Sequence, residues 1–360
     1  MVSQGQRRQI APDLGVPGKK EDHVGAISEF EYRYNMTIKA FPSHAEPAFE
    51  TAQQQSAVWG RRWGCNSDVG QLRMVLMHRP GEEMAVLDAT KRIEHLNSFG
   101  DAEGQTWYWR GTRLPEVGEL QAQHDALTAV LRAEGVEIVP LARCAEGRHK
   151  SVYTRDSSIA VEGGAIVTRL GPVVRRGEEA PVTETLAQLG MPILRTINGT
   201  GLMEGGSFVW LKPGLAAIGL SSRVNEEGAR QVEEVLTATG AEVLRVELPG
   251  YRLHIDGALV MVDADTAIVN PAVLPFWFLE RLERLGIRQV EVHPDDPTGC
   301  LNCLAVRPGR VVMQPGLSPR TADRLDELGI EIVPVEYDLM FEGGGGIHCS
   351  TSPLIRDPIS

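Results

Sequence analysis

Apolar and polar positions repeat in a regular order along the chain from about residue 70. In each unit an apolar run meets a turn with Gly or Asp, a second apolar run follows, and an amphipathic stretch ending at glycine leads to a further apolar run. Apolar residues at three- and four-residue spacing predict helices, and the short apolar runs predict buried strands. The predicted helices are ELQAQHDALTAVLRAEG, APVTETLAQLG, NEEGARQVEEVLTATG, FWFLERLERLG and SPRTADRLDELG.

The five units, each of about 45 residues, indicate an α/β repeat architecture. The Gly and Asp turns between paired apolar runs are typical of hairpins. If the units close into a ring, the loops that enter them meet at one end. The first unit, which starts at QLRMVLMHRPG, is the least regular of the five.

The first 63 residues lie outside this repeat. Residues 1–25 are rich in polar residues, Gly and Pro, and are typical of a loosely held arm. In the next stretch EFEYRYNMTIKAF is strand-like and PAFETAQQQSAVWGRRW is helical in pattern. We therefore expect an N-terminal extension over residues 1–63, to which no role is assigned, and a single domain over residues 64–360.

Composition narrows the class of protein. The chain has 360 residues, of which 42% are hydrophobic, enough for a sizeable core. A formal net charge of -12 argues against nucleic acid as a partner and favours cationic small molecules. We expect no membrane partner, because no apolar stretch is long enough to span a bilayer. The N-terminus lacks the apolar segment of a signal peptide, so a cytoplasmic location is expected.

The five cysteines do not predict a disulfide framework, because their number is odd and small for the length. Cys300 and Cys303 form one CxxC pair in TGCLNCLAVRPG. A structural zinc site needs four ligands, and no second Cys or His pair lies nearby. The simpler interpretation places Cys300 in a loop and Cys303 at the start of a buried strand.

Cys349 is the most informative cysteine, because it follows four glycines in FEGGGGIHCSTSPLIRD. Glycines let the backbone approach a ligand closely, and a thiolate is a strong nucleophile. Acids and a histidine occur in polar breaks beside apolar runs: Asp156 in YTRDSS, Glu204 in LMEGGSFVWL, and His254 with Asp256 in LHIDGALVMV. All of these lie at unit junctions, so a closed ring would bring them together.

One cysteine, one histidine and three carboxylates suit a cationic, planar electrophile that sulfur attacks. A guanidinium group fits, since carboxylates bind it bidentately and its carbon accepts a thiolate. Simpler interpretations remain open. Cys349 can be an inert buried thiol, His254 a structural histidine, and the His/Asp/Glu set a metal site. The chain has no HExxH pattern, and we expect neither a metal nor a cofactor.

From about Asp68 to Arg356 the chain resembles the guanidino-group-modifying superfamily, which contains arginine deiminases, dimethylarginine dimethylaminohydrolases and glycine amidinotransferases. The resemblance rests on motifs in the family's order: GQLRMVLMHRPG, TRDSS, EGGSFVWL, HIDG, LNCLAVRPG and GGGGIHCSTSPLIR. It implies a five-bladed, pseudo-symmetric α/β propeller of ββαβ repeats, the pentein fold. Many deiminases have an acid at the position of Ser207, and His348 before the cysteine is similar to agmatine deiminases and amidinotransferases.

The resemblance also implies roles for individual residues. Cys349 is implied as the nucleophile that forms a covalent amidino intermediate. His254 is implied as the acid that protonates the leaving amine and then as the base that activates water. Glu204 is implied to hold His254 and one face of the guanidinium.

The remaining implied residues bind the substrate. Asp156 and Asp256 are implied to hold the guanidinium nitrogens. Arg223, in GLSSRVNEEG, matches an arginine that binds the substrate carboxylate, and Arg176, in VVRRGEE, matches a second. An ordinary surface role is an open alternative for both arginines.

Three functions therefore compete. The first is a cysteine-dependent hydrolase of the guanidino group of arginine or an arginine-like compound. The second is an amidinotransferase that passes the amidino group to an acceptor amine. The third is a non-catalytic binding protein on the same fold, against which the intact Cys, His and acid set argues. The expected partner is a small guanidino compound, and an assembly of identical chains is compatible with each function.

Overall fold

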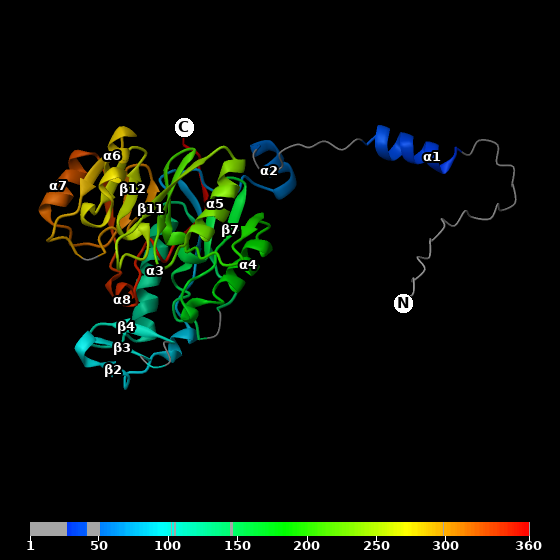
Figure 1. The fold of residues 1–360 in the computed structure, drawn as a ribbon. Helices are drawn as coiled ribbons and strands as arrows, with labels where there is room; N and C mark the ends of the chain where they lie inside the picture. Colours follow the sequence, from blue (N-terminus) through cyan, green and yellow to red (C-terminus); the bar gives the residue numbers. More distant parts are fainter. Residues whose placement is uncertain are drawn as a thin grey trace, which may run out of the picture. The chain divides into compact units, whose positions relative to one another are not determined.

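The computed structural model describes residues 27–41, 51–101, 103, 106–144, 147–297 and 299–359, and divides the chain into two units (Figure 1). The first unit is Met1–Pro47 and the second is Ala48–Ser360.

In the first unit, helix α1 (Glu29–Tyr32) continues into a π-helix, η1 (Arg33–Lys39). The predicted strand in EFEYRYNMTIKAF is therefore wrong. The Ser28 side chain and Glu31 form a capping box at the start of α1. A helix pairs its own backbone groups, whereas a strand needs a neighbouring strand, so the capped sequence forms a helix here.

The second unit begins with helix α2 (Ala52–Trp59), as its sequence pattern predicts. The Trp63 side chain is buried, and its backbone N–H donates to Gln55 Oε1 at 3.1 Å. The Gly64 N–H donates to Leu354 O at 3.1 Å. Residues 51–63, which the sequence places with the extension, thus belong to the second unit.

Five three-stranded sheets form the body of the second unit, each with an antiparallel pair followed by a parallel one. Four follow the ββαβ order without interruption. Their elements are β6 (Ser158–Val161), β7 (Gly164–Val167), α4 (Glu179–Gln188) and β8 (Ile193–Thr196); β9 (Phe208–Lys212), β10 (Leu215–Leu220), α5 (Glu226–Ala238) and β11 (Glu242–Glu247); β12 (Leu259–Asp263), β13 (Thr266–Val269), α6 (Phe276–Arg284) and β14 (Arg288–Glu291); and β15 (Leu304–Arg307), β16 (Arg310–Met313), α7 (Pro319–Glu327) and β17 (Glu331–Pro334).

The first sheet is assembled from both ends of the unit. Strand β1 (Leu72–Met77) pairs in parallel with β5 (Glu137–Pro140) after helix α3 (Val117–Ala133). Its antiparallel partner is β18 (Ser352–Arg356), which follows all the other strands in the sequence. This exchange explains why the first sequence unit is the least regular. The last strand of the chain completes the first blade.

The blades meet through their first strands. Contacts join β18 to β6, β9 to β12, and β12 to β15, while β15 also contacts β1 of the first blade. Helices bury the apolar stripes that the sequence predicts, for example Val232 and Leu236 of α5 and Phe278 and Leu282 of α6. The predicted five-bladed α/β propeller of ββαβ repeats is confirmed.

A sixth, smaller sheet is inserted between β1 and α3 and is absent from the sequence prediction. It contains β2 (Arg92–Ile93), β3 (Ser98–Gly100) and β4 (Tyr108–Arg110). Figure 1 shows it below α3, near the short helix α8 (Asp338–Glu342). Within the described residues, no helix combines the length and the apolar character needed to cross a membrane.

Candidate active site

Polar residues precede the first strand of every blade. They lie in the residues immediately before β6, β9, β12, β15 and β18 and line one cavity of about 780 Å³. Cys349 precedes β18, which completes the first blade. The residues before β6, β9, β12 and β15 are, in that order, Asp156, Glu204, His254 with Asp256, and Asn302.

Single turns of 3-10 helix aim three of these positions into the cavity: η4 (Thr154–Ser157), η6 (Gly205–Ser207) and η7 (Ile255–Gly257). His254 therefore directly precedes the turn η7, and Asp256 lies within it. The turns crowd around Gly206. A Cβ atom there would lie 2.8 Å from Asp156 Oδ1 and 2.9 Å from His254 Nδ1, so only glycine fits.

His254 bridges two carboxylates. Its Nε2 lies 2.6 Å from Glu204 Oε2 and its Nδ1 lies 3.7 Å from Asp156 Oδ1. Burial alone would lower the pKa of His254, but the charge of Asp156 and the hydrogen bond with Glu204 outweigh it and raise the pKa to about 9. The imidazole is therefore protonated at neutral pH and can donate a proton to a leaving group.

Asp156 is held by an arginine that the sequence analysis did not select. Arg175 Nη1 lies 2.5 Å from Asp156 Oδ2, and Arg175 Nη2 lies 2.8 Å from Glu178 Oε2. Burial opposes the charged form of Asp156, yet the charges of His254 and Arg175 lower its pKa. Arg176, the residue after Arg175, is exposed and is not among the residues that line the cavity.

The thiol of Cys349 lies between an amide and a carboxylate. Asn302 Nδ2 donates to Cys349 Sγ at 3.0 Å, and the Cys349 N–H donates to Asn302 Oδ1 at 3.2 Å. The thiol points toward Asp256 Oδ2 at 3.7 Å. Burial and the charges of Asp256 and Asp156 raise the pKa of Cys349 well above its usual value. A bound cation would offset both carboxylate charges and favour the thiolate.

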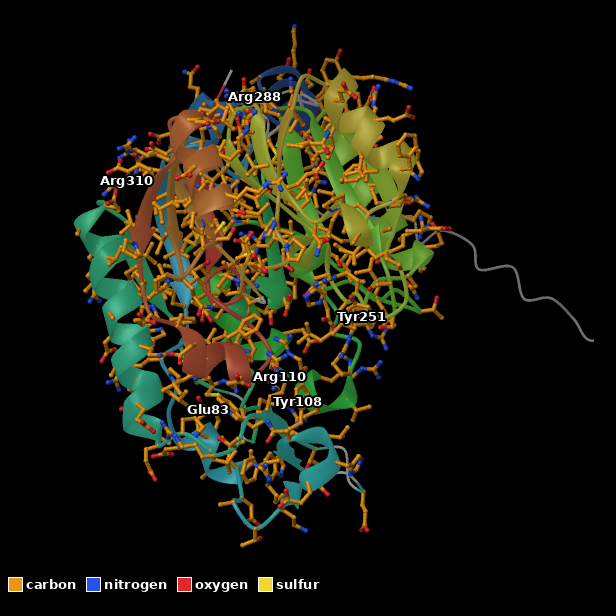
Figure 2. All side chains as sticks on the ribbon, turned by 90° about the vertical axis from the view of Figure 1, so that its left-hand side faces the viewer. Glu83, Tyr108, Arg110, Tyr251, Arg288 and Arg310 are labelled. Carbon is orange, nitrogen blue, oxygen red and sulfur yellow. The ribbon has the colours of Figure 1, made fainter. Side chains whose placement is uncertain are left out.

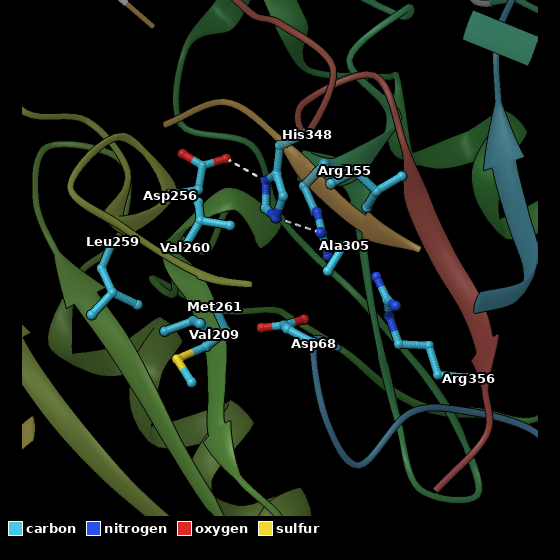
Figure 3. A pocket seen from close by; sticks show the side chains of 11 residues that line it. Asp68, Arg155, Val209, Asp256, Leu259, Val260, Met261, Ala305, His348 and Arg356 are labelled. Carbon is cyan, nitrogen blue, oxygen red and sulfur yellow. Dashed lines mark hydrogen bonds and ion pairs between the residues drawn. The ribbon is translucent and has the colours of Figure 1, made fainter. Parts of the chain in front are cut away.

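A buried polar network supports Asp256 from behind (Figure 3). His348 Nδ1 lies 2.9 Å from Asp256 Oδ2, and His348 Nε2 lies 2.5 Å from Arg155 Nη2. The Arg155 backbone N–H donates to Cys349 O at 3.0 Å. Asp68 and Arg356 line the same small void, and Arg356 Nη1 donates to Gly70 O at 2.7 Å. The network fixes the orientation of Asp256 and of the cysteine loop together.

The glycines before Cys349 allow close packing of aromatic rings. A Cβ atom on Gly345 would lie 2.7 Å from the Tyr153 ring and 2.9 Å from Cys349 Cβ. Gly344 has a φ of +107°, which other residues rarely adopt. Glycine is thus required at these positions because the loop packs closely and turns sharply there. Its small size also leaves the thiol of Cys349 accessible to a ligand.

Cations gather around other parts of the cavity. Arg223 Nη1 lies 3.8 Å from Glu204 Oε1, and Arg110 comes from the inserted sheet. Lys150 is buried, donates to Tyr108 O at 3.2 Å, and lies 3.6 Å from the Tyr108 ring centroid. Burial lowers its pKa well below the usual value. Tyr108 and Arg110 are the two ends of β4 in the inserted sheet, and Figure 2 shows them close together. The cavity thus offers carboxylates for a cation and basic groups for an anion.

The same carboxylates could in principle bind a metal ion. Ligand atoms of Asp156, Glu204 and His254 all lie within 4.8 Å of one another. One oxygen of Asp156 is already occupied by the positively charged Arg175, whose Nη1 lies 2.5 Å from Asp156 Oδ2. The guanidinium of Arg175 competes with a cation at that oxygen, so these residues fit a small metal ion poorly.

The structure brings six of the seven sequence-selected residues to the cavity: Cys349, His254, Glu204, Asp156, Asp256 and Arg223. Asn302, Arg175 and Lys150 also line it and were missed. Asn302 had a usable signal, because it precedes β15 as Glu204 precedes β9. Arg175 differs from Arg176 only in side-chain direction, which adjacent positions in a sequence do not reveal.

Comparisons with known proteins agree with this geometry. A family model described as "N,N dimethylarginine dimethylhydrolase, eukaryotic" matches residues 117–356. An arginine deiminase of Rhodococcus erythropolis is 24% identical over 82% of this chain and 98% of its own.

Two solved structures show the same fold. A dimethylarginine dimethylaminohydrolase from Pseudomonas aeruginosa, solved as a Cys-to-Ser mutant with citrulline, has a TM-score of 0.63 at 22% identity and covers 78% of this chain and 99% of its own. An amidinotransferase of Microseira wollei from the saxitoxin pathway has a TM-score of 0.61 at 14% identity and covers 82% and 98%. Because the family model spans more than half of the sequence, the chain belongs to the N,N dimethylarginine dimethylhydrolase family, within the superfamily of guanidino-group-modifying hydrolases and amidinotransferases.

Proposed function

We propose that this protein is a cysteine-dependent hydrolase of the guanidino group of arginine or an arginine-like compound. The observation that carries the proposal is the convergence of the Cys349 thiol, the His254–Glu204 pair and two further carboxylates on one cavity. The reaction is assigned to the domain over residues 64–360. Residues 1–63 receive no role in it.

Substrate binding prepares the nucleophile in this mechanism. Asp156 and Asp256 attract the guanidinium, and each carboxylate oxygen can accept bonds beyond those it already makes. Arg223 binds the carboxylate at the other end of the substrate, while Arg175, whose guanidinium bonds to Asp156 and Glu178, keeps Asp156 in position. The substrate charge lowers the pKa of Cys349, whose proton leaves to Asp256 or to solvent.

Two chemical steps follow. The Cys349 thiolate attacks the guanidinium carbon, a C–N bond breaks, and His254 gives its proton to the departing amine or ammonia. The amidino group is then attached to sulfur as a cationic thioether. Neutral His254 next takes a proton from water, and the hydroxide attacks the same carbon. As the C–S bond breaks, the proton of the new hydroxyl group passes to Asp256 or to solvent, which leaves a neutral ureido product and the thiolate. Glu204 orients His254 and stabilises its charged form.

The test is a substrate panel. The purified chain is incubated with arginine, N-methylated arginines and other guanidino compounds, and ammonia, alkylamine and ureido products are measured. Acid quenching and mass spectrometry should show an added amidino group on the peptide that contains Cys349. Failure of the whole panel to give a ureido product, with no adduct on that peptide, would falsify the proposal.

The transferase alternative differs only in the second step, in which an acceptor amine replaces water. Adding glycine or another amine to the same assay separates the two functions. Hydrolysis gives a ureido product whether or not the amine is present. Transfer gives a new guanidino compound and free ornithine from arginine, and depends on the amine.

A further inference from the structure

A polar cluster outside the cavity lies at one edge of the first blade. Strands β1 and β5 are parallel neighbours, with Met77 paired to Pro140, and the Leu141 N–H donates to Met77 O at 3.0 Å. The carboxyl ends of neighbouring parallel strands lie at the same edge of a sheet. His78, which directly follows β1, is therefore close to residues 141–144, which follow β5.

Three different side chains meet there. His78 Nε2 lies 3.0 Å from Glu83 Oε1, and the Cys144 side chain hydrogen-bonds to His78. One ligand atom from each of the three lies within 4.8 Å of the others. The side chains of His78 and Glu83 are 12% and 4% exposed. A mixed imidazole, carboxylate and thiol set at this spacing matches the ligand types of transition metals.

Hydrogen bonds on each side hold these ligands in place. Glu83 Oε1 accepts the Gly81 N–H at 2.9 Å. On the other segment, the Ala142 N–H donates to Thr185 Oγ1 at 2.9 Å, and Arg143 Nε lies 2.7 Å from Glu184 Oε2. Both anchors belong to α4 of the next blade. The ligands are thus positioned before any ion arrives, which reduces the entropy cost of binding.

A second imidazole, that of His124, lies beside the cluster. His124 of α3 is 5% exposed, and among the described residues neither of its ring nitrogens has a hydrogen-bond partner. Asp125 Oδ1 is 3.7 Å from its Nδ1, and the charge of His78 acts on the ring. A buried polar group without a partner destabilises the fold. A metal-bound water at this edge would supply such a partner.

We propose that His78, Glu83 and Cys144 bind a Zn²⁺ ion as three protein ligands. In a tetrahedral zinc site, N, O and S ligands lie about 3.4–3.6 Å apart, which needs only small movements from the present arrangement. Water fills the fourth position. Binding requires neutral His78 and the thiolate of Cys144, so it releases protons and strengthens as pH rises.

The ion would connect the inserted sheet to the first blade. Glu83 belongs to η2 (Glu82–Val86), at the start of the segment that leads from β1 to β4. Figure 2 shows Glu83 at the same end of the unit as Tyr108 and Arg110, which line the cavity. Fixing this segment would hold those two side chains in position, while the ion takes no part in C–N cleavage.

Cobalt provides a direct test, because Co²⁺ replaces Zn²⁺ and its bond to a thiolate absorbs in the near ultraviolet. The metal-stripped full chain is titrated with Co²⁺, and one equivalent with a thiolate band is expected. Cys144→Ser should lose the band, and His78→Gln should bind at least tenfold more weakly. Cys349→Ser is the matched control and should retain both the band and the stoichiometry.

Circular dichroism tests whether each variant is folded. If Cys144→Ser does not fold, His78→Gln still tests the proposal independently. The proposal is overturned if wild type binds no cobalt, if Cys144→Ser binds as wild type does, or if the band disappears in Cys349→Ser. The last result would assign the ion to the cavity. None of these readouts depends on turnover, so the guanidino hydrolase proposal is tested separately.

Discussion

His254 Nε2 lies 2.6 Å from Glu204 Oε2 in the cavity, and this hydrogen bond helps to keep His254 protonated. The substitution Glu204→Gln removes a negative charge that raises the pKa of His254. The burial of His254, which lowers this pKa, stays the same. The pKa of His254 should then fall from about 9 toward its usual value. In a bell-shaped profile of kcat/KM, the limb that falls at high pH should move to lower pH by a unit or more. An unchanged limb would assign that ionisation to another group.

The same contact predicts how stability depends on pH. The folded pKa of His254, about 9, lies above the usual 6.5. Protonated His254 therefore stabilises the fold fully below pH 6.5, and this contribution is lost as pH rises through 9. Integrated over that window it amounts to about 3 kcal/mol. Urea unfolding of wild type and His254→Gln between pH 6 and 10 should show a pH-dependent difference that narrows at the alkaline end.

Cys349→Ser should abolish turnover and leave the fold intact, since a serine hydroxyl cannot supply the thiolate. Initial rates of ureido product formation and circular dichroism check the two parts. Retention of more than a few per cent of the wild-type rate contradicts the covalent mechanism.

Asn302 should be required for the reactivity of the thiol. Its N–H donates to Cys349 Sγ, and a hydrogen bond to a charged group contributes about 1.5–3 kcal/mol. Asn302→Ala should therefore reduce kcat by about tenfold to a hundredfold. Asn302→Asp keeps the acceptor for the Cys349 N–H but adds a negative charge, and should be slower still. The pH dependence of iodoacetamide labelling at Cys349 is the measurement, and equal labelling in all three proteins would exclude this role.

Asp156→Asn should reduce kcat/KM for the best guanidino substrate by tenfold to a hundredfold or more, because one charge-assisted contact worth about 1.5–3 kcal/mol is lost. Part of the loss should appear in kcat, since the charge of the bound substrate assists the thiolate. Neutral urea analogues should bind poorly to wild type. Asp125→Asn, at an exposed ion pair with Arg79, is the control and should behave as wild type. Near-normal kinetics of Asp156→Asn would contradict the guanidinium assignment.

Strand β18 should contribute strongly to stability. Leu354 is fully buried in the first blade, so Leu354→Ala should destabilise the fold by about 2–5 kcal/mol. Leu96→Ala, at a position that is 63% exposed, is the matched control. Guanidinium chloride unfolding compares the two. Equal unfolding midpoints for the two variants would show that the packing of β18 contributes little to the stability of the fold.

Periodicity was enough to predict the five blades, because every helix keeps an apolar stripe and ends near glycine. It could not assign β18, since SPLIR is a short apolar run whose partner lies almost the whole chain away. The strand-like appearance of residues 29–41 was misleading because β-branched and aromatic residues also occur in helices, and Ser28 caps this one. Local pattern does not include long-range pairing.

In the candidate site, the residue types were enough to predict the kind of chemistry. They were not enough to predict which side chains point into the cavity. Asp156, Glu204 and His254 stand out as polar residues before apolar strands. The choice between Arg175 and Arg176 depends on a short 3-10 turn (Val173–Arg175) that buries the first and exposes the second. Asn302 could have been selected from its place just before β15, because the other polar residues of the cavity also lie just before the first strand of a blade.

The position of β18 has a consequence for biosynthesis. Cys349 is separated by only two residues from the strand that completes the first blade, so the proposed nucleophile and the closing strand leave the ribosome almost together. A nascent or prematurely terminated chain that lacks residues 349–356 has neither Cys349 nor a finished ring. Incomplete copies of this protein therefore lack the proposed nucleophile, which is made only together with the strand that completes the ring.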